Sequence, residues 1–487
     1  MRREEFFSFE IYEMIFSYIP NSDKATLSSC SQVANRFRDL LQKQIFKSIH
    51  FDYREQYADL NKRKSEKLLI ALESTPKLAE YVKELKLEIA FNQYEPGSDA
   101  ESKLTTAINA TTNIMGHLSS LTTFSITSPS LSHDDMYSKP LQTAIKQLFM
   151  RNTKLTTVDL SGISKFAVAE LQYLHSVNSL TLSSISNHQP LLPGENLSFP
   201  LDQDGLGCTP ISLHLEGNGW IDAIFGTLKG EVKIRDIEGR SNDIYEYKCR
   251  VPYLSFKRLE NLDISSIWFK VDDMNKLLSH VVGKRLQHLK CQAPMYACYQ
   301  DDLAYPKLTT FPRLKTFSVC GLAEFQQGPR SEERPFTASH IPWITQVIKT
   351  LPHPGNVDMT TFADDEGPGL RFMRIVLGVY VFMRCSDQPS DAVKMLDFSP
   401  LIDSIKNIQQ QYKHLRPVPC YMGLKIMLHK FHKDKHPRGH ASDVGAESTG
   451  RYVPAIVSHR DIHEGLSQNP TLKNPSGPGP VWVQLLG

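Results

Sequence analysis

The sequence predicts an α/β protein in which an N-terminal three-helix unit precedes an irregular α/β solenoid with a parallel sheet. Three observations support this prediction. Apolar residues between Phe7 and Ile49 recur at helical spacing. A short strand pattern, with leucine-type residues at its first, fourth and sixth positions, recurs along the middle of the chain. Helical segments lie between these strands, as a stack of strand–helix units requires.

Composition bounds the class of protein. The chain has 487 residues, of which 40% are hydrophobic and 22% charged, so it is expected to be globular. A net charge of +2 gives no electrostatic case for nucleic-acid or membrane binding. The eight cysteines are scattered without a CxxC pair, which favours a reduced intracellular protein, cytoplasmic or nuclear. The apolar run 375–383 is too short to span a membrane and is expected to be a buried strand.

The first fifty residues are expected to form a small helical unit. One apolar helical face runs from Phe7 to Ile19 and ends at Pro20. A second apolar series runs over 25–41, with Asp23 as its expected cap, and a third short segment covers 44–49. So small a core is marginal, so the unit is expected to bury its apolar faces against a partner or the rest of the chain.

Phe7 to Ile49 resembles an F-box, the module that docks onto the small adaptor subunit of cullin–RING ubiquitin ligases. The motif segments that carry the resemblance are Phe7-Ser8-Phe9-Glu10-Ile11, Ile15-Phe16, Ile19-Pro20, Cys30-Ser31-Gln32-Val33-Ala34-Asn35-Arg36-Phe37-Arg38 and Ile45-Phe46-Lys47-Ser48-Ile49. The chain departs from the family at Ser8, where the family has proline, and at Phe37, where it has tryptophan.

The resemblance implies a non-catalytic, substrate-recognition subunit of a Skp–cullin–F-box ligase. Its partners would be a Skp-type adaptor, through it a cullin, and an unidentified protein substrate. The adaptor-binding positions implied by the motif are Phe7, Ile11, Ile15, Pro20, Val33 and Phe37. Three alternatives stay open. The chain could be an F-box scaffold that works outside any ligase, or the segment could be a helical hairpin that packs on its own chain. The chain could also be a cytosolic enzyme with a solenoid-like fold, which would need a pocket of convergent ionisable residues that the sequence does not show.

The strand pattern is that of a leucine-rich repeat. It occurs at Leu85–Leu87, Leu121–Ile126, Leu155–Leu160, Val177–Leu182, Leu213–Leu215, Leu259–Ile264, Leu286–Cys291 and Leu314–Val319. Alternation places the leucine row inward and the residues between on the outer, concave row. The expected outward residues are Lys86, Thr123, Ser125, Thr157, Asp159, Thr181, Asn261, Asp263, His288, Lys290, Thr316 and Ser318. These small polar residues of mixed charge suit a protein partner better than a polyanion.

Helices are expected between the strands, at 107–118, 141–150, 168–177, 220–228, 274–282 and 341–351. The repeat period is irregular, so a fold that merely alternates strands and helices is the alternative. Further strands are expected at 356–362 and 373–382, and 236–251 is expected to be a loop. Leu396 to Ile402 resembles a segment of late repeats in F-box proteins of mushroom-forming fungi.

The sequence therefore divides into four expected parts. These are the F-box (1–50), a charged helical connector (51–77), the leucine-rich-repeat-like solenoid (78–432) and a tail (433–487). Glycine, proline, serine and histidine dominate the tail, and this composition predicts disorder.

No catalytic, cofactor or metal site is predicted. The chain has no glycine-rich phosphate loop, no HExxH and no G-x-S-x-G. Four histidines lie close together at 429, 432, 436 and 440, but Pro437 and Gly439 interrupt any helix that could align them on a zinc ion. The acidic clusters 134–135 and 364–366 are expected to be solvated loops.

Overall fold

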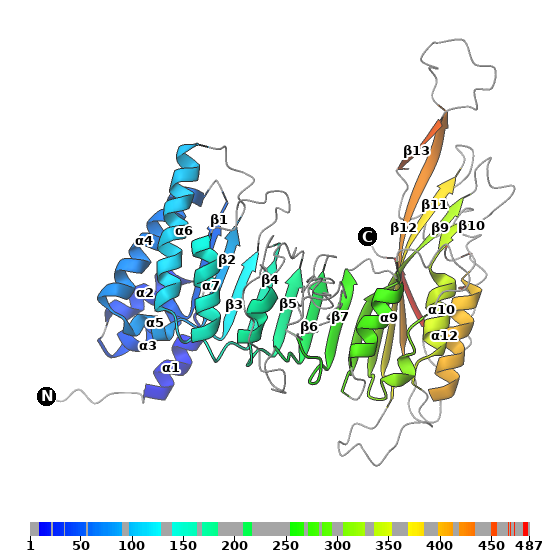
Figure 1. Cartoon of the computed structure of the whole chain (residues 1–487), viewed down its shortest axis with the longest axis horizontal. Coiled ribbons are helices and arrows are strands. Elements are labelled where there is room, and N and C mark those ends of the chain that lie inside the picture. Colours follow the sequence, from blue (N-terminus) through cyan, green and yellow to red (C-terminus); the bar gives the residue numbers. More distant parts are fainter. Residues whose placement is uncertain are drawn as a thin grey trace, which may run out of the picture. The chain divides into compact units, whose positions relative to one another are not determined.

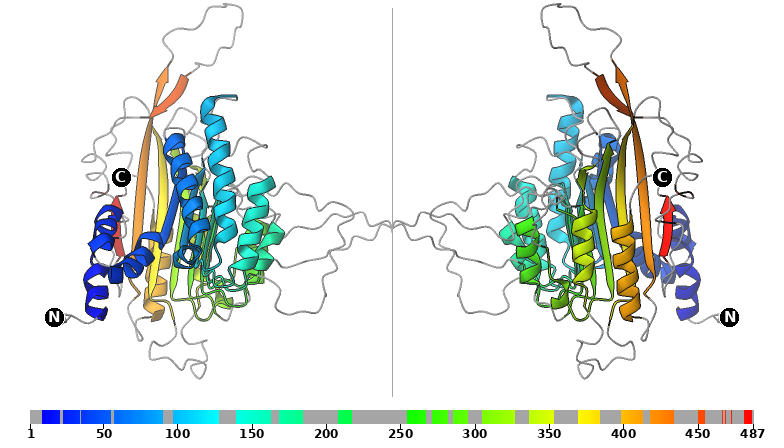
Figure 2. Two further views of the ribbon diagram at one scale, coloured as in Figure 1. Left: turned by 90° about the vertical axis from the view of Figure 1, so that its left-hand side faces the viewer. Right: turned by 90° about the vertical axis from the view of Figure 1, so that its right-hand side faces the viewer.

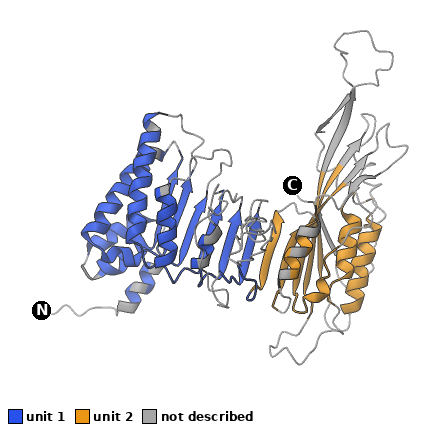
Figure 3. Cartoon of the chain, viewed as in Figure 1, with its two compact units in different colours: residues 1–258 blue, residues 259–487 orange. Residues whose placement is uncertain are grey.

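In the computed structural model the chain forms two compact units, unit 1 (residues 1–258) and unit 2 (residues 259–487), coloured separately in Figure 3. The residues that the structure describes are 9–20, 23–33, 35–54, 57–89, 97–127, 139–162, 168–183, 208–216, 254–266, 271–281, 285–294, 305–326, 336–352, 369–383, 398–412, 418–433, 450–454, 466, 468, 472 and 481–485. Each unit is built from alternating strands and helices, as an α/β fold was expected to be (Figure 1).

Unit 1 begins with helices α1 (Phe9–Ser17), α2 (Lys24–Val33) and α3 (Asn35–Phe46). Asp23 caps α2 as expected, since its carboxylate accepts a 3.1 Å hydrogen bond from the backbone N–H of Thr26. Hydrogen bonds from Thr26 lower the pKa of Asp23. The series expected as one helix over 25–41 is described as two helices on either side of residue 34.

The segment expected as a third short helix at 44–49 differs in the structure. Its first residues complete α3, and a strand starts at Ser48 because alternating apolar residues Ile49, Phe51 and Tyr53 then bury every second side chain. The expected connector 51–77 accordingly holds the end of this strand, followed by α4 (Ala58–Ser74). The helical unit thus continues into the first strand of the sheet.

Six parallel strands form the sheet of unit 1, and they pair in chain order. They are β1 (Ser48–Tyr53), β2 (Glu84–Ile89), β3 (Thr123–Thr127), β4 (Thr157–Ser161), β5 (Ser179–Ser183) and β6 (Ser212–Glu216). Every one of these six strands lies on an expected repeat strand except β1, which the leucine pattern did not mark.

Helices α5 (Lys77–Tyr81), α6 (Asp99–His117) and α7 (Lys139–Arg151) connect these strands, with a 3-10 helix at Val168–Tyr173. Figure 2 shows α6 and α7 together on one side of the strands, and the two helices contact each other. The helix expected at 168–177 is thus a short 3-10 turn, and the one expected at 220–228 lies outside the described residues.

Burial alternates along every strand of unit 1 from β2 to β6, so the expected inward leucine row is confirmed. In register, Leu87, Ile126, Leu160, Leu182 and Leu215 form one buried ladder across the five strands. Each ladder member is 2% exposed or less, so each strand's apolar row is covered by helices and by its neighbours. The intervening residues form what we call the open face of the sheet, opposite the buried rows.

Unit 2 repeats this construction, with longer strands from β9 onward. Its parallel strands pair in the order β7 (Asn261–Ser266), β8 (His288–Gln292), β9 (Thr316–Gln326), β11 (Phe372–Met383) and β12 (Cys420–Lys433). A short strand, β10 (Phe336–Ser339), adds antiparallel to β9. The helices are α9 (Val271–His280), α10 (Ile341–Lys349) and α12 (Ser399–Tyr412), and η4 (Leu308–Thr310) is a 3-10 turn.

Unit 2 also includes two short strands from the C-terminal tail. The strand expected at 356–362 lies outside the described residues. In the tail, where composition predicts disorder, β13 (Gly450–Pro454) pairs antiparallel with the end of β12, and β14 (Val481–Leu485) pairs parallel with its start. A long strand such as β12 offers a row of backbone groups for pairing, and these two short segments of the tail are ordered as strands through that pairing, contrary to the expectation from composition.

Leu182→Ala and Thr181→Ala test the alternation that defines the open face. Leu182 is 2% exposed, and losing its methyl groups should lower the free energy of unfolding by about 2–5 kcal/mol. Thr181 is the half-buried neighbour of Leu182 on the open face, and Thr181→Ala should lower the free energy of unfolding by no more than about 0.5 kcal/mol. Urea denaturation of both variants measures the difference. Equal losses would mean that the register of β5 is wrong.

Candidate protein-docking site

Helix α1 is apolar on two sides, and one of them packs against α2 and α3. Tyr12, Phe16 and Ile19 lie on the inner side, where Phe16 joins a buried cluster with Leu27, Leu40 and Leu41. The ring of Phe37 completes this side, with centroid distances of 4.9 Å to Tyr12 and 5.2 Å to Phe16. The three N-terminal helices therefore have a small aromatic and aliphatic core of their own.

Gln44 links α3 to the end of α1 through side-chain hydrogen bonds. Its side-chain amide donates hydrogen bonds to the backbone carbonyls of Phe16 at 3.0 Å and of Ile19 at 3.3 Å. The last carbonyls of a helix lack their usual partners in the helix, and Gln44 supplies a donor here; the Phe16 carbonyl also accepts a 3.0 Å hydrogen bond from the backbone N–H of Ile19. These bonds hold the end of α1 against α3.

The outer side of α1 carries large apolar residues at spacings of three and four: Ile11, Met14, Ile15 and Tyr18. Met14 is 54% exposed, Ile15 46% and Tyr18 81%. We call these four residues the α1 outer stripe. At the end of α2, Val33 is 76% exposed. Apolar side chains gathered on one helix face in this way are typical of a protein-binding surface.

The six positions expected to bind an adaptor have different places in the structure. Ile15, Val33 and Pro20 are exposed, and Ile11 is half-buried on the outer stripe. Phe37 packs into the core of the helical unit, so the structure places it mainly in an internal role. Phe7 lies outside the described residues. Met14 and Tyr18 were not among the six, although their spacing from Ile11 could have identified them.

The open face of each unit's strands is a second candidate surface. All twelve residues expected to point outward are half-buried or exposed, which confirms that row. On the open face of unit 1 most charges are paired internally. Glu88 lies 2.6 Å from Lys86 and 3.3 Å from His50, and its hydrogen bond with Lys86 lowers its pKa. Asp159 accepts a 3.3 Å hydrogen bond from Ser125, so this face has few unsatisfied charged groups.

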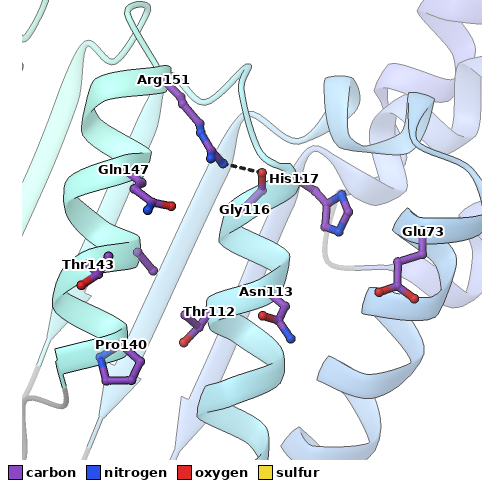
Figure 4. A pocket seen from close by; sticks show the side chains of 10 residues that line it. Glu73, Thr112, Asn113, Gly116, His117, Pro140, Thr143, Gln147 and Arg151 are labelled. Carbon is purple, nitrogen blue, oxygen red and sulfur yellow. Dashed lines mark hydrogen bonds between the residues drawn. The ribbon is translucent and has the colours of Figure 1, made fainter.

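The helix side of unit 1 has a shallow groove of about 760 Å³ between α6 and α7, which Figure 4 shows with its lining residues. Arg151 crosses its end and donates a 2.7 Å hydrogen bond to the carbonyl of Gly116. The Thr112 hydroxyl donates within its own helix, to Ile108. Glu73 and His117 also line the groove, but these groups do not form a catalytic arrangement, and we assign it no reaction.

Within the described parts of the chain, no group of three histidine, cysteine or acidic residues could hold a metal ion. Residues 429 and 432 of the histidine cluster lie in β12, and residues 436 and 440 lie outside the described residues. The five described cysteines, Cys30, Cys208, Cys291, Cys320 and Cys420, are free thiols. Over the same residues, every helix is too short or too polar to cross a membrane.

Comparison with known proteins does not identify the chain. No protein-family profile matches the sequence, and no curated protein matches it significantly. Any function assigned to the docking surfaces therefore rests on their geometry and on the F-box resemblance of residues 7–49.

Phe37→Ala and Ile15→Ala separate the core of the helical unit from its outer stripe. Removing the Phe37 ring should destabilise α1–α3 by about 2–4 kcal/mol, because the ring packs on Tyr12 and Phe16. Ile15→Ala should change their stability by about 0.5 kcal/mol or less, since that side chain is exposed. Amide hydrogen exchange in α1–α3 of the full chain measures both effects. A larger effect of Ile15→Ala would show that the outer stripe is covered by this chain.

Proposed function

We propose that this protein is the substrate-recognition subunit of a Skp–cullin–F-box ubiquitin ligase. In this proposal α1–α3 are an F-box that docks a Skp-type adaptor, and the α/β solenoid binds a target protein. The protein performs no bond chemistry itself. It works in the cytoplasm or nucleus and raises the effective concentration of its target near the ubiquitin carrier.

One observation carries the proposal, namely that the α1 outer stripe is exposed beside a formed core. Burying an exposed isoleucine, methionine or tyrosine in a partner's groove stabilises a complex by roughly 1.5–3 kcal/mol for each side chain. The two hydrogen bonds from Gln44 and the aromatic contacts of Phe37 hold α1, and with it the α1 outer stripe, in place before binding. A preformed stripe lowers the entropy cost of docking.

The alternative function is an F-box scaffold that binds the adaptor without a cullin. The F-box resemblance and the α1 outer stripe support both functions equally. Co-purification distinguishes them, because a ligase subunit recovers the adaptor together with a cullin, whereas a scaffold recovers the adaptor alone.

The test of adaptor docking is the double variant Ile15→Asp and Val33→Asp, co-expressed as the full chain with a Skp-type adaptor. A carboxylate buried in an interface without a partner should lower the affinity at least about 100-fold. The melting temperature should stay close to that of the parent, because both side chains are exposed.

The control is Ile70→Asp, which adds one carboxylate, half the charge change of the double variant, at an isoleucine of α4 that is 65% exposed. This control should bind the adaptor as tightly as the parent chain. Unchanged adaptor binding by a folded double variant would refute docking through α1 and α2, and equal loss in the control would indicate a non-specific effect of charge.

A further inference from the structure

The open face of unit 2 differs from that of unit 1 in its charge. One row of positions crosses β7, β8, β9, β11 and β12 in register, formed by Asp263, Lys290, Ser318, Arg374 and Tyr421. All five are partly exposed. With strands about 4.8 Å apart, four spacings make the row about 19 Å long, the span of roughly six residues of extended peptide.

Arg374 is the cation on this row that lacks a carboxylate partner among the described residues. Its guanidinium carbon lies 5.3 Å from the centroid of the Tyr421 ring. Its Nε atom is buried without a hydrogen-bond partner. The hydroxyl of Ser318, the next residue of the row, is likewise buried without one. Buried polar groups are nearly always paired, so two adjacent unpaired groups indicate a place where an external acceptor completes the bonding.

Lys290 adds positive charge at the same place. It is partly neutralised by Asp263, whose carboxylate lies 3.0 Å from its ammonium group. Lys290 and Arg374 are the row's two positions on either side of Ser318. Burial raises the pKa of the Cys320 thiol, and both cations oppose that rise.

The next row of the open face adds no lysine or arginine to this charge. It contains Asn261, His288, Thr316 and Phe372 in register. Burial, assisted by the charge of Lys315, lowers the pKa of His288, so its imidazole is neutral at pH 7. Phe372 is 38% exposed and lies two residues before Arg374 on the same side of β11. An exposed aromatic ring thus stands beside the unpaired guanidinium.

We infer that the open face of unit 2 binds an acidic segment of a partner protein, with an aspartate or glutamate carboxylate on Arg374 and an apolar side chain on Phe372. This inference deepens the proposed function and rests on it in one respect, that the solenoid presents a protein-binding face. A guanidinium and a carboxylate form paired, charge-assisted hydrogen bonds, so the arginine is suited to this ligand.

The charges of the row favour a carboxylate over other anions. Within the row, Asp263 already offsets Lys290, which leaves Arg374 as the row's one uncompensated positive charge for a ligand group of one negative charge. A phosphorylated side chain carries up to two negative charges, and a nucleic acid needs several cations along its backbone. The length of the row and the ring of Phe372 suit an extended peptide that alternates acidic and apolar residues.

The test uses a fluorescein-labelled peptide of alternating glutamate and valine, with anisotropy of the full chain as the readout. Matched probes replace each glutamate with glutamine or with phosphoserine, and a single-stranded oligonucleotide is the fourth probe. The glutamate peptide should bind, and added salt should weaken it. Arg374→Gln should weaken this binding about tenfold, and Arg374→Lys should restore part of it.

Arg54→Gln is the matched control, because Arg54 also lies 5.3 Å from a tyrosine ring, that of Tyr57, but is paired with Asp52. Peptide binding should be unchanged in this variant. Thermal melting of each variant shows whether it folds.

Four results would overturn the inference. They are no binding of the glutamate peptide up to about 1 mM, equal binding of the glutamine peptide, a preference for phosphoserine or the oligonucleotide, or full binding by folded Arg374→Gln. Adaptor binding by the same samples is read separately. Binding of the peptide without binding of the adaptor would support this inference and refute the proposed function. Binding of the adaptor without binding of the peptide would refute this inference and support the proposed function.

Discussion

The structure depends on the burial of every second side chain along short parallel strands. In unit 1 the inward ladder from Leu87 to Leu215 is almost fully buried, and the ladder through Phe124 and Val158 is buried in the same way. A shift of register by one residue would expose these rows and bury polar ones. This constraint fixes both the helix side of each sheet and the composition of its open face.

The same constraint explains why the sequence predicts much of the fold. Leucine spacing identifies five of the six strands of unit 1, and helical periodicity identifies α6 and α7. The pattern misses β1, where Ile49, Phe51 and Tyr53 alternate without leucine. Tail strands β13 and β14 could not be predicted from local composition, because their order comes from backbone pairing with β12. Long-range pairing of this kind leaves little local signal.

The candidate sites show a similar division. Helical spacing predicts an apolar α1. It does not predict that one side of α1 packs on Phe37 while Met14, Ile15 and Tyr18 on the other side are exposed. That distinction depends on contacts between residues some twenty-five positions apart, including the bond from Gln44 to Ile19. The unpaired Arg374 depends in the same way on strand order, since neither its register with Ser318 nor its ring contact with Tyr421 follows from local pattern.

The central claim is that the outer side of α1 and the end of α2 form the surface that another protein covers. Hydrogen–deuterium exchange of the full chain, with and without a purified Skp-type adaptor, tests it most directly. The account predicts that the adaptor slows exchange in peptides from 9–33 and leaves those from the strands of unit 2 unchanged. Protection confined to unit 2, or no protection anywhere at saturating adaptor, would contradict it.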